Sequence, residues 1–177
     1  MGVLKVQYLP QYTIEDYMSW DGDWELIHGI PYAMSPSPTS GHQRAGLNVM
    51  QVLKDALAES SCKCEIFYDL DWHIKEDTVV RPDVVVLSGD KLKDDFVTRT
   101  PSLVVEILSP STGDKDRTLK AELYAEAGVV NYVIIDHLKQ EIEIFLLTKG
   151  KYQLNKSPEI HLSECKILPD WPNVFEE

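Results

Sequence analysis

The stretch Leu103–Leu108 (LVVEIL) is a run of apolar, often β-branched residues that a single acid, Glu106, interrupts. Val79–Leu87 is a second run of this kind, and it contains Asp83 just after Pro82. Runs that are apolar at successive positions are typical of strands covered on both faces of a sheet. We therefore expect two buried strands, each of which carries one carboxylate.

The position of Glu106 in the middle of such a strand is informative. Burying an unpaired carboxylate is costly, so this side chain needs a cationic partner or a metal ion. If the two strands are neighbours, Asp83 and Glu106 can converge on one point, where two carboxylates and water suit Mg²⁺. The sequence also allows plainer roles, in which Asp83 pairs with Arg81 and Glu106 has a purely structural partner.

A helix is predicted over residues 114–127, directly after the strand that carries Glu106. Asp116, Lys120 and Tyr124 are spaced i, i+4 and i+8, so they share one face of this helix. Lys120 could then lie near the two carboxylates, where it would orient a water molecule or balance the charge of a phosphate. A surface ion pair between Asp116 and Lys120 and a packing role for Tyr124 are the competing interpretations.

The remaining segments add an N-terminal helix, a hairpin, a long second helix and further strands. We expect the first helix to run from its N-cap Thr13 to Met18 or Trp20, a loop over residues 35–41 and a helix over 42–59. Further strands are expected at residues 24–27, 30–34, 65–68, 71–74, 129–136, 141–147 and 152–154, with a loop at 169–172.

This order of elements predicts an α/β or α+β fold, in which a mixed central sheet is flanked by helices. Residues 1–177 are expected to form a single domain. Residues 1–40 would pack on its body as a helix, a hairpin and a Pro-rich loop.

Composition places the chain among globular proteins: 17 Lys and Arg face 29 Asp and Glu, for a net charge of −12, and 44% of the residues are hydrophobic. No apolar run reaches the length of a membrane span, about 18 residues, and the first ten residues lack the pattern of a signal peptide. We interpret the three cysteines as reduced thiols in a cytoplasmic protein that contacts no membrane. The negative charge is a poor overall match for nucleic acid, although a local basic groove is compatible with it.

Five groups of residues form a specific combination. In chain order they are ELI before Gly29, MSPSP before His42, RPDVVV at 81–86, VEILSPST at 105–112, and the set Asp116, Lys120, Tyr124, Gly128 and Tyr132. Over residues 12–144 the chain resembles the Uma-two family, a bacterial group of restriction-endonuclease-like proteins in the PD-(D/E)XK nuclease superfamily.

The resemblance implies a restriction-endonuclease-like core and hydrolysis of phosphodiester bonds with Mg²⁺ or Mn²⁺. Asp83 would be the aspartate of the motif and Glu106 its second acid, with the carbonyl of Ile107 as a further metal ligand. The lysine of the motif would fall at Leu108, whose side chain is apolar. Lys120 on the following helix is then the matching residue.

The resemblance also suggests roles for residues outside the motif. Glu25 resembles an additional acidic metal ligand of some superfamily members, whereas in an ordinary hairpin it would be exposed. His42, Asp116 and Tyr124 are expected to line the site, and His42 could equally be an ordinary residue in the first turn of its helix.

Two functions from different classes follow. The first is a nuclease that acts on DNA, as a homodimer, because cutting both strands usually needs two sites. The second is a catalytically silent module that binds nucleic acid or protein through the same fold, which the charge of −12 favours. A bound metal would favour the enzyme, and an ion pair filling the same space would favour the module.

Overall fold

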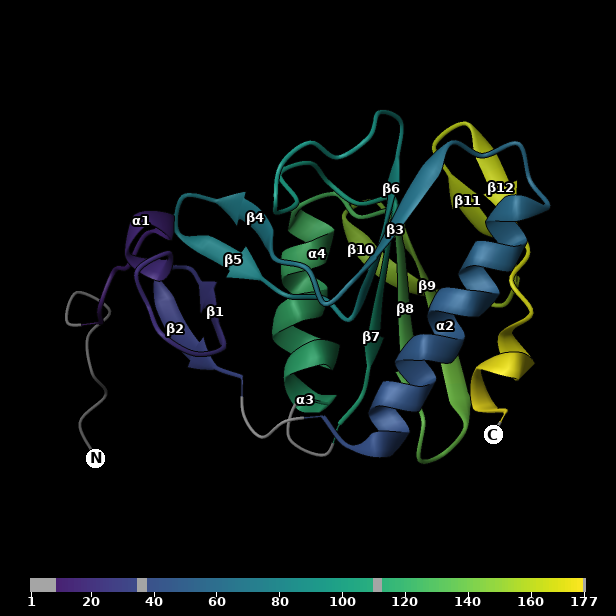
Figure 1. Cartoon of the computed structure of the whole chain (residues 1–177), viewed down its shortest axis with the longest axis horizontal. Coiled ribbons are helices and arrows are strands. Elements are labelled where there is room, and N and C mark those ends of the chain that lie inside the picture. Colours follow the sequence, from purple (N-terminus) through teal and green to yellow (C-terminus); the bar gives the residue numbers. More distant parts are fainter. Residues whose placement is uncertain (1–8, 35–37, 110–112, 177) are drawn as a thin grey trace.

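The computed structural model describes residues 9–34, 38–109 and 113–176, which form two main sheets and the helices that cover them (Figure 1). The larger sheet has six strands in the order β10-β9-β8-β7-β6-β3. Their bounds are β3 Cys64–Tyr68, β6 Val84–Ser88, β7 Leu103–Ile107, β8 Asn131–Asp136, β9 Glu141–Thr148 and β10 Lys151–Asn155.

The smaller sheet has four strands in the order β2-β1-β5-β4. Their bounds are β1 Trp24–Ile27, β2 Ile30–Ala33, β4 Trp72–Lys75 and β5 Thr78–Val80. A separate pair near the C-terminus consists of β11 (Ile160–Leu162) and β12 (Cys165–Ile167).

The helices are short apart from α2. They are α1 Ile14–Tyr17, α2 Ser40–Ala58, α3 Gly113–Lys115, a π-helical turn Asp116–Lys120, α4 Ala121–Glu126 and a 3₁₀ helix Trp171–Phe175. None of the helices in the described ranges is long and apolar enough to cross a lipid bilayer.

β7 and β8 pair in parallel, whereas the other neighbouring strands of the large sheet are antiparallel. A parallel pair requires a crossover connection, and here residues 113–126 supply it as consecutive helical segments. The prediction of a mixed α+β sheet flanked by helices is confirmed.

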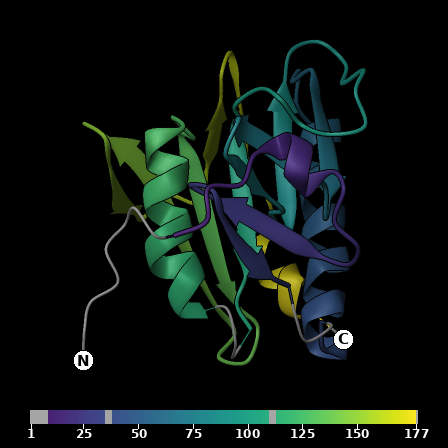
Figure 2. The same cartoon turned by 90° about the vertical axis from the view of Figure 1, so that its left-hand side faces the viewer.

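Burial on both sides explains the apolar sequence of β7. Leu103, Val105 and Ile107 pack in a cluster with α2, while Val104 and Leu108 pack in a second cluster with α4. Figure 2 shows the sheet between these two helices. Glu106 shares the α4 side with its alternate neighbours, because successive side chains of a strand point to opposite faces.

The N-terminal hairpin packs on this body through the second cluster. Ile27 of β1, Trp72 of β4 and Val80 of β5 are buried together with Leu123 and Tyr124 of α4. The small sheet therefore covers part of the face onto which Glu106 projects.

The prediction of one strand over Val79–Leu87 is wrong. The run contains β5 and β6, which belong to different sheets and are separated by residues 81–83. Pro82 lacks an N–H and restricts its own backbone, so the ladder cannot continue through it. Both halves of the run look alike in sequence because both are buried.

Local signals at the helix ends were informative to different degrees. Thr13 and Asp16 form a capping box at α1, as the N-cap prediction requires. The second helix begins at Ser40, two residues before the predicted start at His42, because Thr39 caps it and accepts the N–H of His42.

Two further predictions about secondary structure need correction, and one pair of strands was not predicted. The helix expected over 114–127 is not continuously α-helical, since residues 116–120 form a π-helical turn. The tail predicted as loop at 169–172 enters a 3₁₀ helix at Trp171. The three-residue strands β11 and β12 were too short to give a periodic signal. Residues 35–37 of the predicted Pro-rich loop lie outside the described residues.

The expectation of three reduced thiols is also wrong. Cys62 and Cys165 form a disulfide with their Cα atoms 5.6 Å apart, and Cys64 is a free thiol. The bond joins the segment after α2 to the C-terminal strand pair. These two cysteines therefore give no indication of a reducing compartment.

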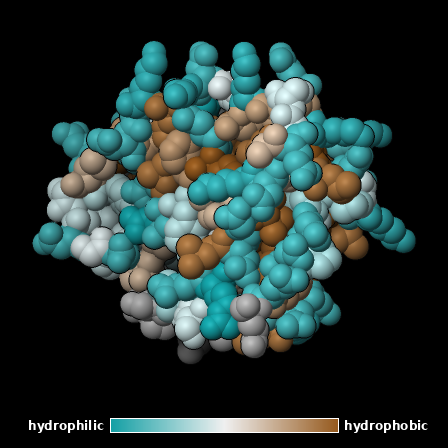
Figure 3. All heavy atoms as spheres, turned by 45° about the vertical axis from the view of Figure 1, so that its right-hand side comes forward, coloured by the Kyte–Doolittle hydropathy of each residue, from teal (hydrophilic) through white to brown (hydrophobic). Residues whose placement is uncertain are grey.

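On the side of the molecule that carries α2 and the C-terminal strands, hydrophobic residues are scattered among hydrophilic ones (Figure 3). Leu47 and Leu168 are among the exposed large apolar residues of the chain. Isolated apolar residues on a surface are common and need no partner to explain them.

The disulfide gives the first prediction. Its cysteines lie 103 residues apart, so Cys62→Ser should lower the free energy of unfolding by about 2–4 kcal/mol, because the unfolded chain loses a large closed loop. Urea unfolding without reductant measures this. Cys64→Ser is the matched control and should change stability by less than about 1 kcal/mol. Equal stability of Cys62→Ser and the parent protein would contradict the bond.

Candidate active site

The site begins where β6 and β7 separate. Their pairing ends at Val84 and Val105, so the next residues along, Asp83 and Glu106, lie opposite one another without a ladder between them. Asp83 Oδ2 instead accepts the N–H of Ile107 at 2.7 Å. A side-chain carboxylate thus takes over a backbone hydrogen bond at the point where the strands part.

Asp83 also contacts His42, which stands in the first turn of α2. His42 Nε2 lies 3.4 Å from Asp83 Oδ1, and the imidazole is buried. Burial alone would lower the pKa of His42, but the hydrogen bond and negative charge of Asp83 outweigh it and raise that pKa. The alternative that Asp83 pairs with Arg81 is wrong, because the Arg81 guanidinium binds Asp71 and Asp23 instead.

A second histidine packs against the first. The rings of His42 and His137 meet edge to face with centroids 6.2 Å apart. Gly41 permits this approach, because a Cβ at that position would lie 3.0 Å from the His137 ring. The start of α2 is thereby fixed beside Asp83.

Glu106 is buried on the opposite side of β7 from α2. Its Oε1 accepts hydrogen bonds from Lys120 Nζ at 3.0 Å and from Tyr124 OH at 2.5 Å. Burial raises the pKa of Glu106 well above its usual value, Lys120 opposes this, and the nearby charges of Asp116 and Asp83 add to it. The predicted packing role of Tyr124 holds as well, since its ring stacks on Trp72.

Lys120 is the centre of the buried cluster. Its Nζ lies 3.0 Å from Glu25 Oε1, 3.0 Å from Glu106 Oε1 and 3.6 Å from Asp116 Oδ1. Burial alone would lower the pKa of Lys120, but Glu106, Glu25 and Asp116 raise it well above its usual value, so the ammonium stays charged. The alternative of a surface pair with Asp116 is wrong, because both residues are buried.

Glu25 is fully buried, so the alternative of an exposed hairpin residue is wrong for it. Its Oε1 accepts the backbone N–H of Arg81 at 3.0 Å, and its Oε2 binds Lys115 Nζ at 2.5 Å. Burial would raise the pKa of Glu25, but Lys120 and Lys115 lower it to about 2. Glu25 therefore ties β1 both to the turn between the sheets and to the crossover helices.

The π-helical turn carries Asp116 and Lys120 toward these acids. Tyr132 OH of β8 donates to the backbone carbonyl of Asp116 at 2.9 Å, which anchors the turn to the sheet. Short π-helical segments often occur at functional sites. The i, i+4, i+8 spacing correctly grouped Asp116, Lys120 and Tyr124, but it gave no sign of the turn.

Sequence reasoning missed Lys115 and the role of Arg81. Lys115 lay in the predicted helix without a motif around it. Arg81 binds Asp71 through Nε at 2.7 Å and Asp23 through Nη1 at 2.8 Å, so it fixes the turn that precedes Asp83. Its place directly before Pro82 and Asp83 was the available signal.

Within residues 9–34, 38–109 and 113–176, no three His, Cys, Asp or Glu side chains are close enough to form a complete metal centre by themselves. The arrangement offers two carboxylates at the fork and a buried, charged lysine next to one of them.

Residues 14–172 match the sequence model of the Uma2 family, whose description is "Putative restriction endonuclease", and the chain belongs to that family. The crystal structure of "a putative nuclease belonging to DUF820" from Anabaena variabilis shares its fold, with a TM-score of 0.69 and 15% sequence identity. The match covers 92% of this chain and 97% of the other. No curated protein matches.

The buried carboxylate of Glu25 gives the second prediction. A pKa lowered from 4.5 to about 2 corresponds to about 3 kcal/mol of stability. That stability is present above about pH 4.5 and is lost as the pH falls toward 2. Glu25→Gln should therefore be less stable than the parent at pH 7, and the difference should shrink below about pH 4.5.

Urea unfolding at several pH values measures this difference. Glu15→Gln, which changes an exposed acid on α1, is the control and should leave stability within about 0.5 kcal/mol of the parent. A Glu25→Gln difference that does not depend on pH would contradict the assignment.

Proposed function

We propose that this protein is an endonuclease that hydrolyses phosphodiester bonds in DNA and depends on Mg²⁺ or Mn²⁺. The observation that carries the proposal is the placement of Asp83 and Glu106 opposite one another at the fork between β6 and β7, with Lys120 bound to Glu106. A buried acid and a buried lysine, Glu106 and Lys120, are costly to keep, so their presence beside the partly exposed Asp83 in a nuclease-like fold favours a chemical task.

The residues at the fork suit a magnesium ion. Asp83, directly before β6, and Glu106 of β7 supply hard carboxylate oxygens, and the carbonyl of Ile107 is a further hard oxygen ligand. Mg²⁺ commonly uses one or two carboxylates and keeps several waters, so it does not need a third acidic ligand. The Asp83 side chain retains 20% exposure, which leaves this end of the site open to water and substrate.

Glu25 has a different task in this proposal from the metal-binding role that the resemblance suggested. Its two oxygens already engage Lys120, Lys115 and the N–H of Arg81. We assign it the task of holding Lys120 in place.

A divalent cation held by Asp83 and Glu106 would polarise the phosphate and lower the pKa of a bound water. Lys120 balances negative charge that develops on the scissile phosphate, which it can do because its neighbours keep it protonated. Tyr124 orients Glu106 through its hydroxyl, His42 holds Asp83, and Asp116 is a further acid beside Lys120. DNA is proposed to bind a homodimer through a local surface, since the net charge of −12 opposes tight non-specific binding.

A second candidate function is a non-catalytic module that binds nucleic acid or protein. The observation that favours it is the complete set of ion pairs around Lys120, which neutralises Glu25 and Glu106 without a metal. A module of this kind would bind its partner without cleaving it.

Plasmid cleavage with Mg²⁺, and then with Mn²⁺, separates the two functions. We expect metal-dependent cleavage by the parent protein and none by Glu106→Gln, which keeps the side-chain shape and removes the charge. Glu141→Gln, an exposed acid on β9, is the control and should cleave normally. Cleavage by Glu106→Gln would assign the activity to another site or a contaminant. Cleavage by neither protein would favour the module.

A positioning role for His42 can be tested by metal binding alone. His42→Ala removes a donor to Asp83 and should weaken Mn²⁺ affinity by about tenfold, whereas His42→Gln should retain most of it. Electron paramagnetic resonance of free Mn²⁺ measures the affinity. Gln43→Ala, an exposed neighbour, should bind as the parent does. Unchanged affinity in His42→Ala would remove His42 from the site.

A further inference from the structure

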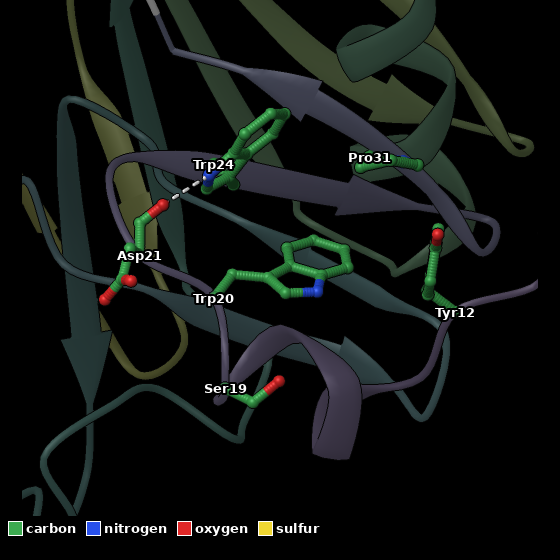
Figure 4. A pocket seen from close by; sticks show the side chains of 6 residues that line it. All are labelled: Tyr12, Ser19, Trp20, Asp21, Trp24 and Pro31. Carbon is green, nitrogen blue, oxygen red and sulfur yellow. Dashed lines mark hydrogen bonds between the residues drawn. The ribbon is translucent and has the colours of Figure 1, made fainter.

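A pocket of about 450 Å³ opens on the N-terminal part of the chain, away from the candidate active site. Six residues line it: Tyr12, Ser19, Trp20, Asp21, Trp24 and Pro31 (Figure 4). Trp24 and Glu25 are consecutive in β1, so their side chains point to opposite faces of the small sheet. We call this hollow the aromatic pocket.

Three rings meet at steep angles in the aromatic pocket. Trp20 lies in the middle, with its ring centroid 5.2 Å from that of Tyr12 and 5.9 Å from that of Trp24. The interplanar angles are 88° and 67°. Rings arranged in this way form a corner, which suits a compact group more than a flat nucleobase that needs an open ring face.

The charge around the pocket is negative. Residues 9–43 contain no Lys or Arg, whereas five acids fall between Glu15 and Glu25. Asp23 and Glu25 pair with Arg81 and with lysines, but Glu15, Asp16 and Asp21 have no ion-pair partner within the described part of the chain. This environment repels phosphate and attracts a cation.

The pocket offers few free hydrogen-bond acceptors. The carbonyl of Asp21 already accepts Trp24 Nε1–H at 2.8 Å, and Ser19 Oγ donates to Asp16 O at 2.6 Å. Figure 4 shows the Asp21 carboxylate turned away from the rings. A primary ammonium or a guanidinium would lose hydrogen bonds to water there without replacing them. A quaternary ammonium group has no N–H and loses none.

We propose that the aromatic pocket binds a quaternary ammonium group. Trp20, Trp24 and Tyr12 hold it by cation–π attraction, and the surrounding acids add a favourable field. The proposal does not depend on nuclease activity, because the pocket shares no residue with the fork.

Choline and its neutral isostere, 3,3-dimethylbutan-1-ol, are the probes, because the two differ chiefly in charge. The chain has four tryptophans, and their indole N–H signals in ¹H–¹⁵N spectra of the full chain report where a ligand binds. We expect choline to shift the signals of Trp20 and Trp24 saturably and to leave those of the buried Trp72 and Trp171 unchanged. The neutral isostere should bind about tenfold more weakly or not at all.

Substitutions of the ring residues test whether choline binds in the aromatic pocket. Trp20→Leu should weaken choline binding about tenfold or more, and Tyr12→Leu, which changes an exposed ring, gives a second test if Trp20→Leu does not fold. Met18→Ala is the control, since Met18 is exposed and does not line the pocket, and it should bind as the parent does. The proposal is overturned by absence of saturable shifts, by equal affinity for the neutral isostere, or by unchanged binding in the folded ring variants.

Discussion

The buried contact between Lys120 and the two acids Glu25 and Glu106 is the constraint on which the site depends. Each acid comes from a different sheet, and the lysine comes from the crossover that joins β7 to β8. Buried charges of this kind are tolerated only when partners compensate them closely, and removing one partner leaves the others uncompensated. The contact therefore fixes the small sheet, the large sheet and the helical crossover relative to one another.

In the turn at residues 81–83, side chains satisfy the backbone N–H groups that the sheets leave unpaired. The N–H of Arg81 is bound by Glu25, Pro82 has no N–H to satisfy, and Asp83 satisfies the N–H of Ile107. Side chains thus complete the backbone hydrogen bonding where the two sheets separate. At this fork the strands no longer pair with one another, and carboxylates occupy the space between them.

The sequence predicted which residues take part in the candidate site better than it predicted the strand boundaries and ion pairs that bring them together. Glu106 could be identified because an acid in a strand that is apolar on both faces needs a partner that compensates its buried charge. The division of Val79–Leu87 into two strands could not be predicted, since a buried run has the same appearance whether it enters one sheet or two. The burial of Glu25 could not be predicted either, because the two lysines that compensate its charge, Lys115 and Lys120, are distant from it in the sequence.

Other features have no local signal at all. The π-helical turn leaves the i, i+4, i+8 grouping of Asp116, Lys120 and Tyr124 intact, so the side-chain pattern does not reveal it. The pairing of Cys62 with Cys165 depends on the tertiary fold, because spacing alone does not fix the connectivity of three cysteines. Such features follow from contacts between distant parts of the chain.

Crystals grown with Mn²⁺ would show whether the fork between β6 and β7 binds a metal ion, because anomalous scattering locates the metal without reference to activity. We expect an anomalous peak at the fork, in contact with Asp83 and Glu106, while Lys120 remains bound to Glu25. This expectation would be contradicted by saturating Mn²⁺ that leaves no peak there and leaves the pair of Lys120 and Glu106 unchanged.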